Sequence, residues 1–142
     1  MRLRLATMED LARLLPARLP RRHFQAYAVQ LKRSAAIAAE DDLGVFAVGG
    51  LYPDEDACEQ ECWLHLRGNP RARVRDVLQA VLTVLEAAED GWPVVAHVDA
   101  QSPRNLRFAA FLGFVTVQEV PATRIAPRSI KLVRSSPNET DW

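Results

Sequence analysis

The centre of the chain carries the clearest hydrophobic pattern. Apolar residues recur there every three or four positions: Val74, Val77, Leu78, Val81, Leu82, Leu85 and Ala88. This period predicts an amphipathic helix over residues 74–90, with one wide apolar face and with Gly91 as its C-terminal cap residue. Five residues of this face are expected to be largely buried: Val77, Leu78, Val81, Leu82 and Leu85.

Three segments before this helix have strand character. Residues 35–40, 45–52 and 58–66 are runs rich in apolar residues, although the first consists mainly of alanine, a poor strand former. Polar turns at 41–44 and 53–56 separate them. Connections this short predict an antiparallel meander. Nearer the start, Leu3 and Leu5 alternate with arginines, which indicates a short half-buried strand.

The segment after the central helix completes a crossover. Residues 93–99 form a compact apolar run, and a strand, helix and strand of this length predict a right-handed parallel connection. Ser102 and Pro103 are typical of a helix start, and Gly113 of a helix end. Residues 114–120 alternate as a strand, and residues 128–133 predict a last one.

Two further helices are predicted in the first quarter of the chain. Thr7 is a good N-cap with acidic residues after it, and Pro20 opens the second helix. The order of elements is then β-α-α-β-β-β-α-β-α-β-β. We expect one α/β (α+β) domain over residues 1–134 and a C-terminal tail at 135–142, which has no periodicity. Trp63 and Trp92 are expected in its core.

Composition and charge narrow the function classes. Apolar residues make up 49% and charged residues 25%, as in soluble globular proteins, and the formal net charge is zero. A neutral chain has no global attraction to nucleic acid or anionic lipid, and no apolar run is long enough for a membrane span. Cys58 and Cys62 would lie roughly 13 Å apart on one strand, too far for a disulfide. Two cysteines without a histidine pair do not make a zinc site, so we expect a cytoplasmic protein without a metal.

A basic turn joins the third of these strands to the central helix. Arg71, Arg73 and Arg75 surround the helix start, where free N–H groups and the helix dipole favour an anion. The turn is therefore either a seat for an anion such as a diphosphate or a solvated basic connection.

The order of elements, together with short motifs, resembles the GNAT superfamily of N-acetyltransferases. Residues 4–11, Arg-Leu-Ala-Thr-Met-Glu-Asp-Leu, are similar to the start of that family, and residues 111–114, Phe-Leu-Gly-Phe, to its Leu-Gly-Phe motif. The resemblance covers about residues 2–134. Residues 104–108, which lead into Leu112 and Gly113, also resemble the divergent GNAT-like proteins of tailed phages.

This resemblance implies both a fold and a reaction. The fold would be a mixed, mostly antiparallel sheet of about six or seven strands, with strands 4 and 5 as a central parallel pair and about four flanking helices. The reaction would transfer an acetyl group from acetyl-CoA, a CoA thioester, to an amine acceptor, and a homodimer is compatible with it. The implied cofactor-binding residues are Leu66, Arg71, Ala72, Arg73, Val74, Arg75 and Asn105. For Asn105, a helix-capping or surface role is the alternative.

The predicted CoA loop departs from the family pattern. Family members place glycines there, because glycine lets backbone N–H groups approach the pyrophosphate. Alignment on Arg67 puts Pro70, which has no N–H, at the central glycine, whereas alignment on the helix puts Arg73 and Arg75 at the glycine positions. Either the guanidinium groups replace the lost donors or the cofactor site is lost.

The residues at the expected catalytic positions also differ from the family pattern. Ala109 stands where many family members carry a tyrosine general acid, and spacing places neither tyrosine of the chain there. The remaining candidates are His65 and Glu61, on one face of the predicted fourth strand, and then His97 on the fifth. The alternative is a strip of polar residues paired within a wide sheet.

Three functions follow from these observations, in order of preference. The first is an acyl-CoA-dependent N-acyltransferase of unknown acceptor. The second is a GNAT-fold protein without catalysis, a binding or assembly factor, including one related to phage proteins. A nucleic-acid-binding module comes last, because the net charge is zero and no aromatic residues are interleaved with the arginines.

Overall fold

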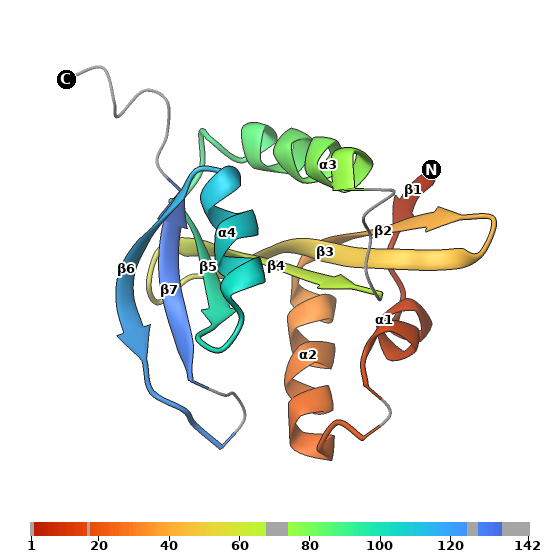
Figure 1. Ribbon diagram of the computed structural model, residues 1–142, viewed down its shortest axis with the longest axis horizontal. Coiled ribbons are helices and arrows are strands. Elements are labelled where there is room, and N and C mark those ends of the chain that lie inside the picture. Colours follow the sequence, from red (N-terminus) through yellow and green to blue (C-terminus); the bar gives the residue numbers. More distant parts are fainter. Residues whose placement is uncertain (1, 17, 68–73, 125–127, 135–142) are drawn as a thin grey trace.

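The computed structural model describes residues 2–16, 18–67, 74–124 and 128–134, and its elements form one sheet covered on both faces by helices (Figure 1). In chain order, the elements are β1 (Arg2–Leu5), α1 (Met8–Leu14), α2 (Arg21–Arg33), β2 (Ala35–Asp41), β3 (Gly44–Asp54), β4 (Glu59–Leu66), α3 (Val74–Ala87), β5 (Val94–Asp99), α4 (Pro103–Phe111), β6 (Phe114–Val120) and β7 (Ser129–Arg134). None of the described helices is both long and apolar enough to cross a membrane.

The sheet has seven strands in the order β1-β2-β3-β4-β5-β7-β6. The meander β2-β3-β4 is antiparallel, and β4 and β5 are parallel, as predicted. The other neighbouring pairs in the sheet are antiparallel. The predicted fold class is therefore confirmed, with the parallel pair at the centre and α3 as its crossover helix.

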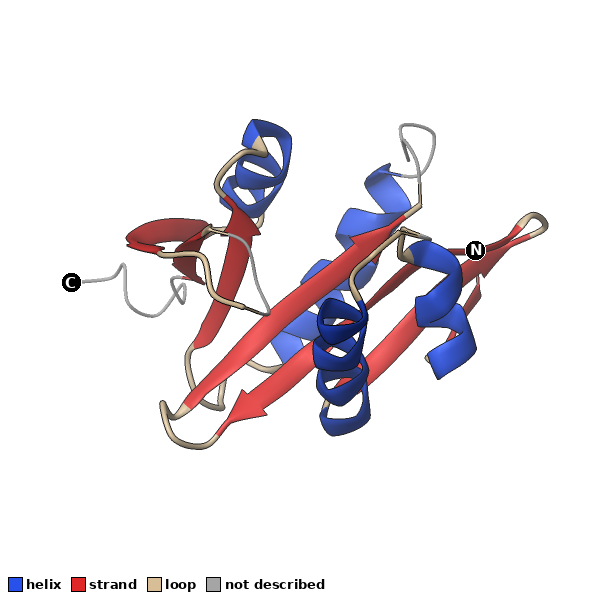
Figure 2. Cartoon of the chain, turned by 90° about the horizontal axis from the view of Figure 1, so that it is seen from below, coloured by secondary structure: helices blue, strands red, loops and turns tan. Residues whose placement is uncertain are grey.

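The two faces of the sheet are covered by different helices. On one face, Leu11 of α1 and Leu31 of α2 pack with Trp63 of β4 in one buried cluster. On the other, Leu85 of α3 and Ala109 of α4 belong to a second buried cluster. Figure 2 shows α1 and α2 in front of the strands. Because strand side chains alternate between faces, β4 contributes Trp63 to the first cluster and Cys62 to the second.

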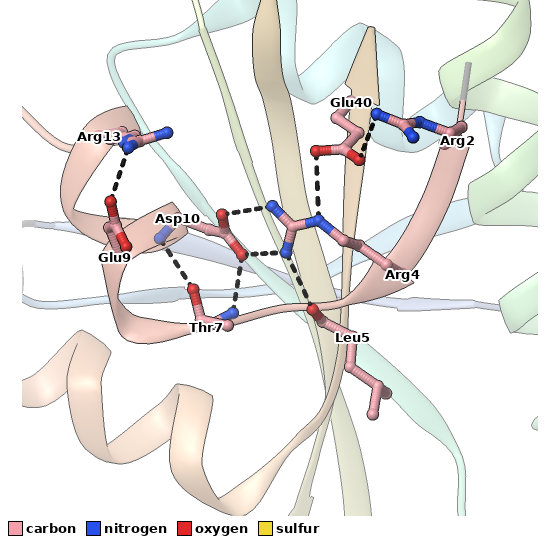
Figure 3. A network of polar contacts seen from close by, with 8 residues as sticks. All are labelled: Arg2, Arg4, Leu5, Thr7, Glu9, Asp10, Arg13 and Glu40. Carbon is pink, nitrogen blue, oxygen red and sulfur yellow. Dashed lines mark hydrogen bonds and ion pairs between the residues drawn. The ribbon is translucent and has the colours of Figure 1, made fainter.

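The entry into α1 is held by a network of charged groups (Figure 3). Asp10 accepts hydrogen bonds from Nη1 and Nη2 of Arg4 at 2.7 and 2.8 Å and from the backbone N–H of Thr7 at 2.8 Å. The Thr7 hydroxyl in turn accepts from the backbone N–H of Asp10. The predicted N-cap is thus part of a reciprocal capping box, whose acidic partner is almost fully buried.

The central helix differs from the prediction in length and packing. It ends at Ala87, before a turn in which Gly91 donates its N–H to the carbonyl of Ala88. Val77 and Leu85 are buried, whereas Leu78, Val81 and Leu82 are only partly buried in the second cluster. The core position of Trp63 is confirmed, but that of Trp92 is wrong: it is 40% exposed, because its turn lies outside the helix–sheet interface.

Candidate active site

The parallel pair at the centre of the sheet is short, because β4 and β5 separate soon after they meet. Only Gln60 with Val94 and Glu61 with Val95 are in register. The two strands then diverge (Figure 1). A cleft of about 1050 Å³ lies at this separation, and its lining includes Tyr27 on one face of the sheet and Leu78 on the other. The cleft therefore reaches both faces of the sheet.

The separation leaves one backbone edge of β4 without a strand partner among the described residues. Gln60 donates its backbone N–H to the carbonyl of Pro93 at 2.9 Å, so even-numbered residues of β4 direct their backbone groups toward β5. The backbone groups of Cys62, Leu64 and Leu66 have the same orientation, but β5 does not pair with these residues. These groups are free to hydrogen-bond an extended molecule that carries amides.

Glu61 lies where the two strands part. Its Oε1 is 3.4 Å from Nδ1 of His97 on β5 and 3.5 Å from Nε2 of Gln30 on α2. Both contacts are long for hydrogen bonds, so the carboxylate is loosely held and retains acceptor capacity. The side chains of Glu61 and His97 are 29% and 35% exposed, and both residues line the cleft.

His65 lies two pleats further along the same face of β4. Its ring packs edge-on against Tyr27, with centroids 4.9 Å apart, and lies 5.7 Å from the ring of Trp63. Burial lowers its pKa, because the charged imidazolium would lose its hydration. Its Nε2 is buried and has no hydrogen-bond partner among the described residues. His65 is therefore a neutral ring in the wall of the cleft.

The thiol of Cys62 faces the helices α3 and α4 and lines the cleft on that side. Burial raises its pKa to about 11, with a smaller contribution from the neighbouring Glu61 carboxylate. The thiolate is the reactive form, and it is hardly populated at neutral pH. Cys62 therefore acts as a small apolar side chain.

The predicted cofactor-binding residues fall into two groups. Leu66 ends β4, partly buried, and Arg75 is exposed in the first turn of α3, which Val74 begins. Arg71, Ala72 and Arg73 lie outside the described residues. Since Leu66 packs in the third buried cluster with Val77 of α3, the end of β4 and the start of α3 lie close together. This is the arrangement that the anion-seat hypothesis requires.

Asn105 and Ala109 lie on α4, beside the cleft. Asn105 is exposed and lines the cleft, and its backbone N–H donates to the hydroxyl of the N-cap residue Ser102. Ala109 is 6% exposed in the second cluster, so the position of the family's tyrosine holds only a methyl group. The side chain that caps α4 is that of Ser102 rather than that of Asn105.

Sequence reasoning missed three features of this site. It did not pair Glu61 with His97, because the register of a parallel pair depends on contacts across the crossover helix. It also missed Gln30 and Tyr27, which reach the cleft from α2. The only available signal was their position on the predicted helix: Tyr27 shares the apolar face with Leu31, and Gln30 flanks that face.

Known proteins resemble this chain in structure but not detectably in sequence. No protein-family model matches the chain, and no curated protein matches its sequence. Among solved structures, the aminoglycoside 6'-N-acetyltransferase from Enterococcus faecium is similar over 94% of this chain and 96% of that one, with a TM-score of 0.69 and 14% identity. A mutant of spermidine N-acetyltransferase SpeG from Vibrio cholerae is similar over 94% of both chains, with a TM-score of 0.68 and 12% identity.

A third solved structure, the IAA acetyltransferase from Bacillus cereus, is similar over 93% of this chain and 97% of that one, with a TM-score of 0.68 and 14% identity. These identities are low, but the shared architecture spans nearly the whole of each chain. Together with the parallel pair that separates after two residue pairs, the similarity identifies the architecture: the chain has the fold of the GNAT acetyltransferases.

Proposed function

We propose that the chain is an acyl-CoA-dependent N-acyltransferase, which transfers an acetyl group from acetyl-CoA to an amine. The observation that carries the proposal is the separation of β4 and β5 around a cleft, with Glu61 and His97 at its closed end. A thioester needs little chemical help to acylate an amine beyond orientation and removal of a proton. The cleft offers a place to orient the reactants, and its titratable groups can remove the proton.

The residues around the gap fit the shape and chemistry of CoA. The backbone groups of Cys62, Leu64 and Leu66 offer hydrogen bonds to the amides of a pantetheine arm. The start of α3 and Arg75 offer positive charge to a diphosphate, and we assign Arg71 and Arg73 the same role. Bound there, CoA would supply the activated acyl group. The chain itself would hold the arm extended and keep water from the thioester.

The groups at the closed end of the cleft would remove a proton from the acceptor amine. An amine is an ammonium at neutral pH and attacks only after it loses a proton. Glu61 and His97 lie 3.4 Å apart, so a proton that either one accepts remains within reach of the other and of the open side of the cleft. His65 is neutral and lines the same face, so we propose it as a second base or as a positioning group.

A second candidate function is a GNAT-fold binding or assembly protein without catalysis, including one of phage origin. The favouring observation is Ala109, which leaves no hydroxyl in the buried position of α4 to protonate the departing thiolate. A thiolate is a stable leaving group near neutral pH, so a protein donor accelerates the reaction without being indispensable to it. For this reason the enzyme remains our first choice.

Calorimetric titration with acetyl-CoA separates the two functions. We expect binding by the wild-type protein and weakening by about two orders of magnitude or more in Arg73→Ala/Arg75→Ala, since each charge-assisted hydrogen bond contributes about 1.5–3 kcal/mol. The loss should shrink as salt rises. Arg21→Ala/Arg22→Ala is the matched control, because it removes the same charge at the start of α2. Absence of acetyl-CoA binding by the wild type would favour the binding protein.

A further inference from the structure

The wall of the cleft on the side of α1 and α2 is apolar and aromatic. Leu14, Leu15 and Pro16 line it from the end of α1, and Tyr27 lines it from α2. With Trp63 and His65 of β4, Tyr27 forms a continuous group of rings, which we call the aromatic wall. The pKa of His65 is lowered by burial, so this wall carries no cation that would repel an amine.

Carboxylates are scarce in the same cleft. Of the lining residues that the structure describes, only Glu61 and Asp99 are acidic. Asp99 already accepts the backbone N–H of Gln101 at 2.8 Å, in the turn that precedes α4. Among the described residues, Glu61 makes only the two long contacts given above, both through Oε1. The carboxylate of Glu61 is therefore loosely held and lies next to the aromatic wall.

This arrangement distinguishes between classes of amine. A single ammonium group can bind Glu61 while an apolar body covers the rings and buries their surface. A polyamine would instead place its further ammonium groups against apolar and aromatic side chains. A buried charge without a partner is costly, so a polyamine should bind poorly.

We infer that the acceptor is a monoamine with an apolar or aromatic body, whose ammonium binds Glu61 and whose body lies on the aromatic wall of Tyr27, Trp63 and His65. The inference rests on the proposed function, because it describes the acceptor side of the same cleft. It deepens that proposal by excluding polycationic acceptors. The part of the cleft at α3 and α4 remains for the acyl donor.

Direct binding measurements test this inference without any need for turnover. The probes are phenethylamine, phenethyl alcohol, which lacks the ammonium, and spermidine, each titrated calorimetrically at pH 7 and constant salt. We expect phenethylamine to bind about tenfold or more tightly than the alcohol, since one hydrogen bond to a charged group corresponds to at least this factor. It should also bind more tightly than spermidine, whose further ammonium groups would lose hydration against apolar side chains. In Glu61→Gln, the advantage of phenethylamine over the alcohol should disappear.

A second variant tests the aromatic wall. Tyr27→Leu keeps an apolar side chain on the same face of α2 and should weaken phenethylamine several-fold, without abolishing the effect of the ammonium. Far-UV circular dichroism checks that both variants are folded. Equal or tighter binding of spermidine would overturn the inference, as would undetectable phenethylamine binding or an unchanged preference in Glu61→Gln.

The acetyl-CoA titration keeps this test separate from that of the proposed function. A protein that binds acetyl-CoA but prefers spermidine overturns the acceptor class alone. A protein that binds phenethylamine through Glu61 but does not bind acetyl-CoA overturns the acyltransferase proposal and leaves the monoamine site standing.

Discussion

The corner around α1 and the gap between β4 and β5 both contain buried or half-buried polar groups, but they satisfy them differently. At the corner, Asp10 is 3% exposed and accepts three hydrogen bonds shorter than 3 Å. Arg4 also reaches Glu40 of β2, which pairs with Arg2 (Figure 3). In the gap, and within the described part of the chain, Glu61 has only contacts of 3.4 and 3.5 Å, and Nε2 of His65 has no partner.

The difference separates groups that hold the fold from groups that await a ligand. A satisfied buried polar network fixes the relative positions of its elements, here β1, α1 and β2. An unsatisfied group costs stability and is retained where a bound molecule completes it. If this interpretation is correct, substitutions at the corner should change stability, and substitutions in the gap should change activity or binding. The following predictions test that division, from the largest expected effect to the smallest.

Glu61→Gln should cause the largest change, and it should appear in turnover. Loss of a general base reduces kcat by about a hundredfold or more, whereas loss of two long contacts should leave the free energy of unfolding almost unchanged. Initial rates with acetyl-CoA and phenethylamine measure the first quantity, and urea denaturation the second. Glu59→Gln is the matched control, because Glu59 lies on the same face of β4 but pairs with Lys131 at 2.9 Å. A similar loss in both variants would contradict the assignment.

Asp10→Ala should show the opposite behaviour. It leaves the capping box incomplete and removes the bidentate partner of Arg4, so we expect a loss of about 1.5–3 kcal/mol in the free energy of unfolding. Acetyl-CoA affinity should not change. Urea denaturation measures the loss, and Glu9→Ala serves as control, since its pair with Arg13 lies on the helix surface. If the two variants have equal stability, the corner does not hold the fold.

Acid should weaken the corner through the same carboxylate. The hydrogen bonds from Arg4 are the main cause that lowers the pKa of Asp10 to about 2, from an ordinary value of 3.8. A lowered pKa contributes stability that is present above pH 4 and is lost as the pH falls toward 2, by about 2 kcal/mol for such a shift. Asp10→Asn should therefore show a shallower fall of unfolding free energy in this window. An identical slope in both proteins would refute the contribution.

His65→Phe should have the smallest effect on stability, with a favourable sign. The change removes a buried nitrogen without a partner, so the free energy of unfolding should stay equal or rise by about 1 kcal/mol. Burial lowers the pKa of His65, so the wild type should lose stability as the pH falls below about 6.5, where the unfolded chain takes up a proton.

The phenylalanine variant should lack this component of the pH dependence. Its turnover should fall if His65 takes part in catalysis, while acetyl-CoA affinity stays nearly intact. A clear destabilisation by His65→Phe would show that the nitrogen has a partner in the folded protein.

Much of the fold was predictable because its determinants are local. The capping residues Thr7 and Ser102 begin their helices as predicted, and Gly113, at a φ of +94°, follows α4 in a conformation that favours glycine. The end of α3 was not predictable to the same degree, because the apolar period continues to Ala88 while the helix ends at Ala87. The exposure of Trp92 also depends on where the turn after α3 lies, which its own sequence does not specify.

The site was predictable only in part. The sequence by itself determined that Glu61, Trp63 and His65 share one face of a strand, since side chains alternate along β structure. Only the tertiary structure decided that β4 and β5 separate after two residue pairs, that His97 meets Glu61, and that Tyr27 of α2 packs on His65. The physical reason is the range of the interactions. Period and capping act within a few residues, whereas parallel register and helix placement arise from packing between segments that lie far apart along the chain.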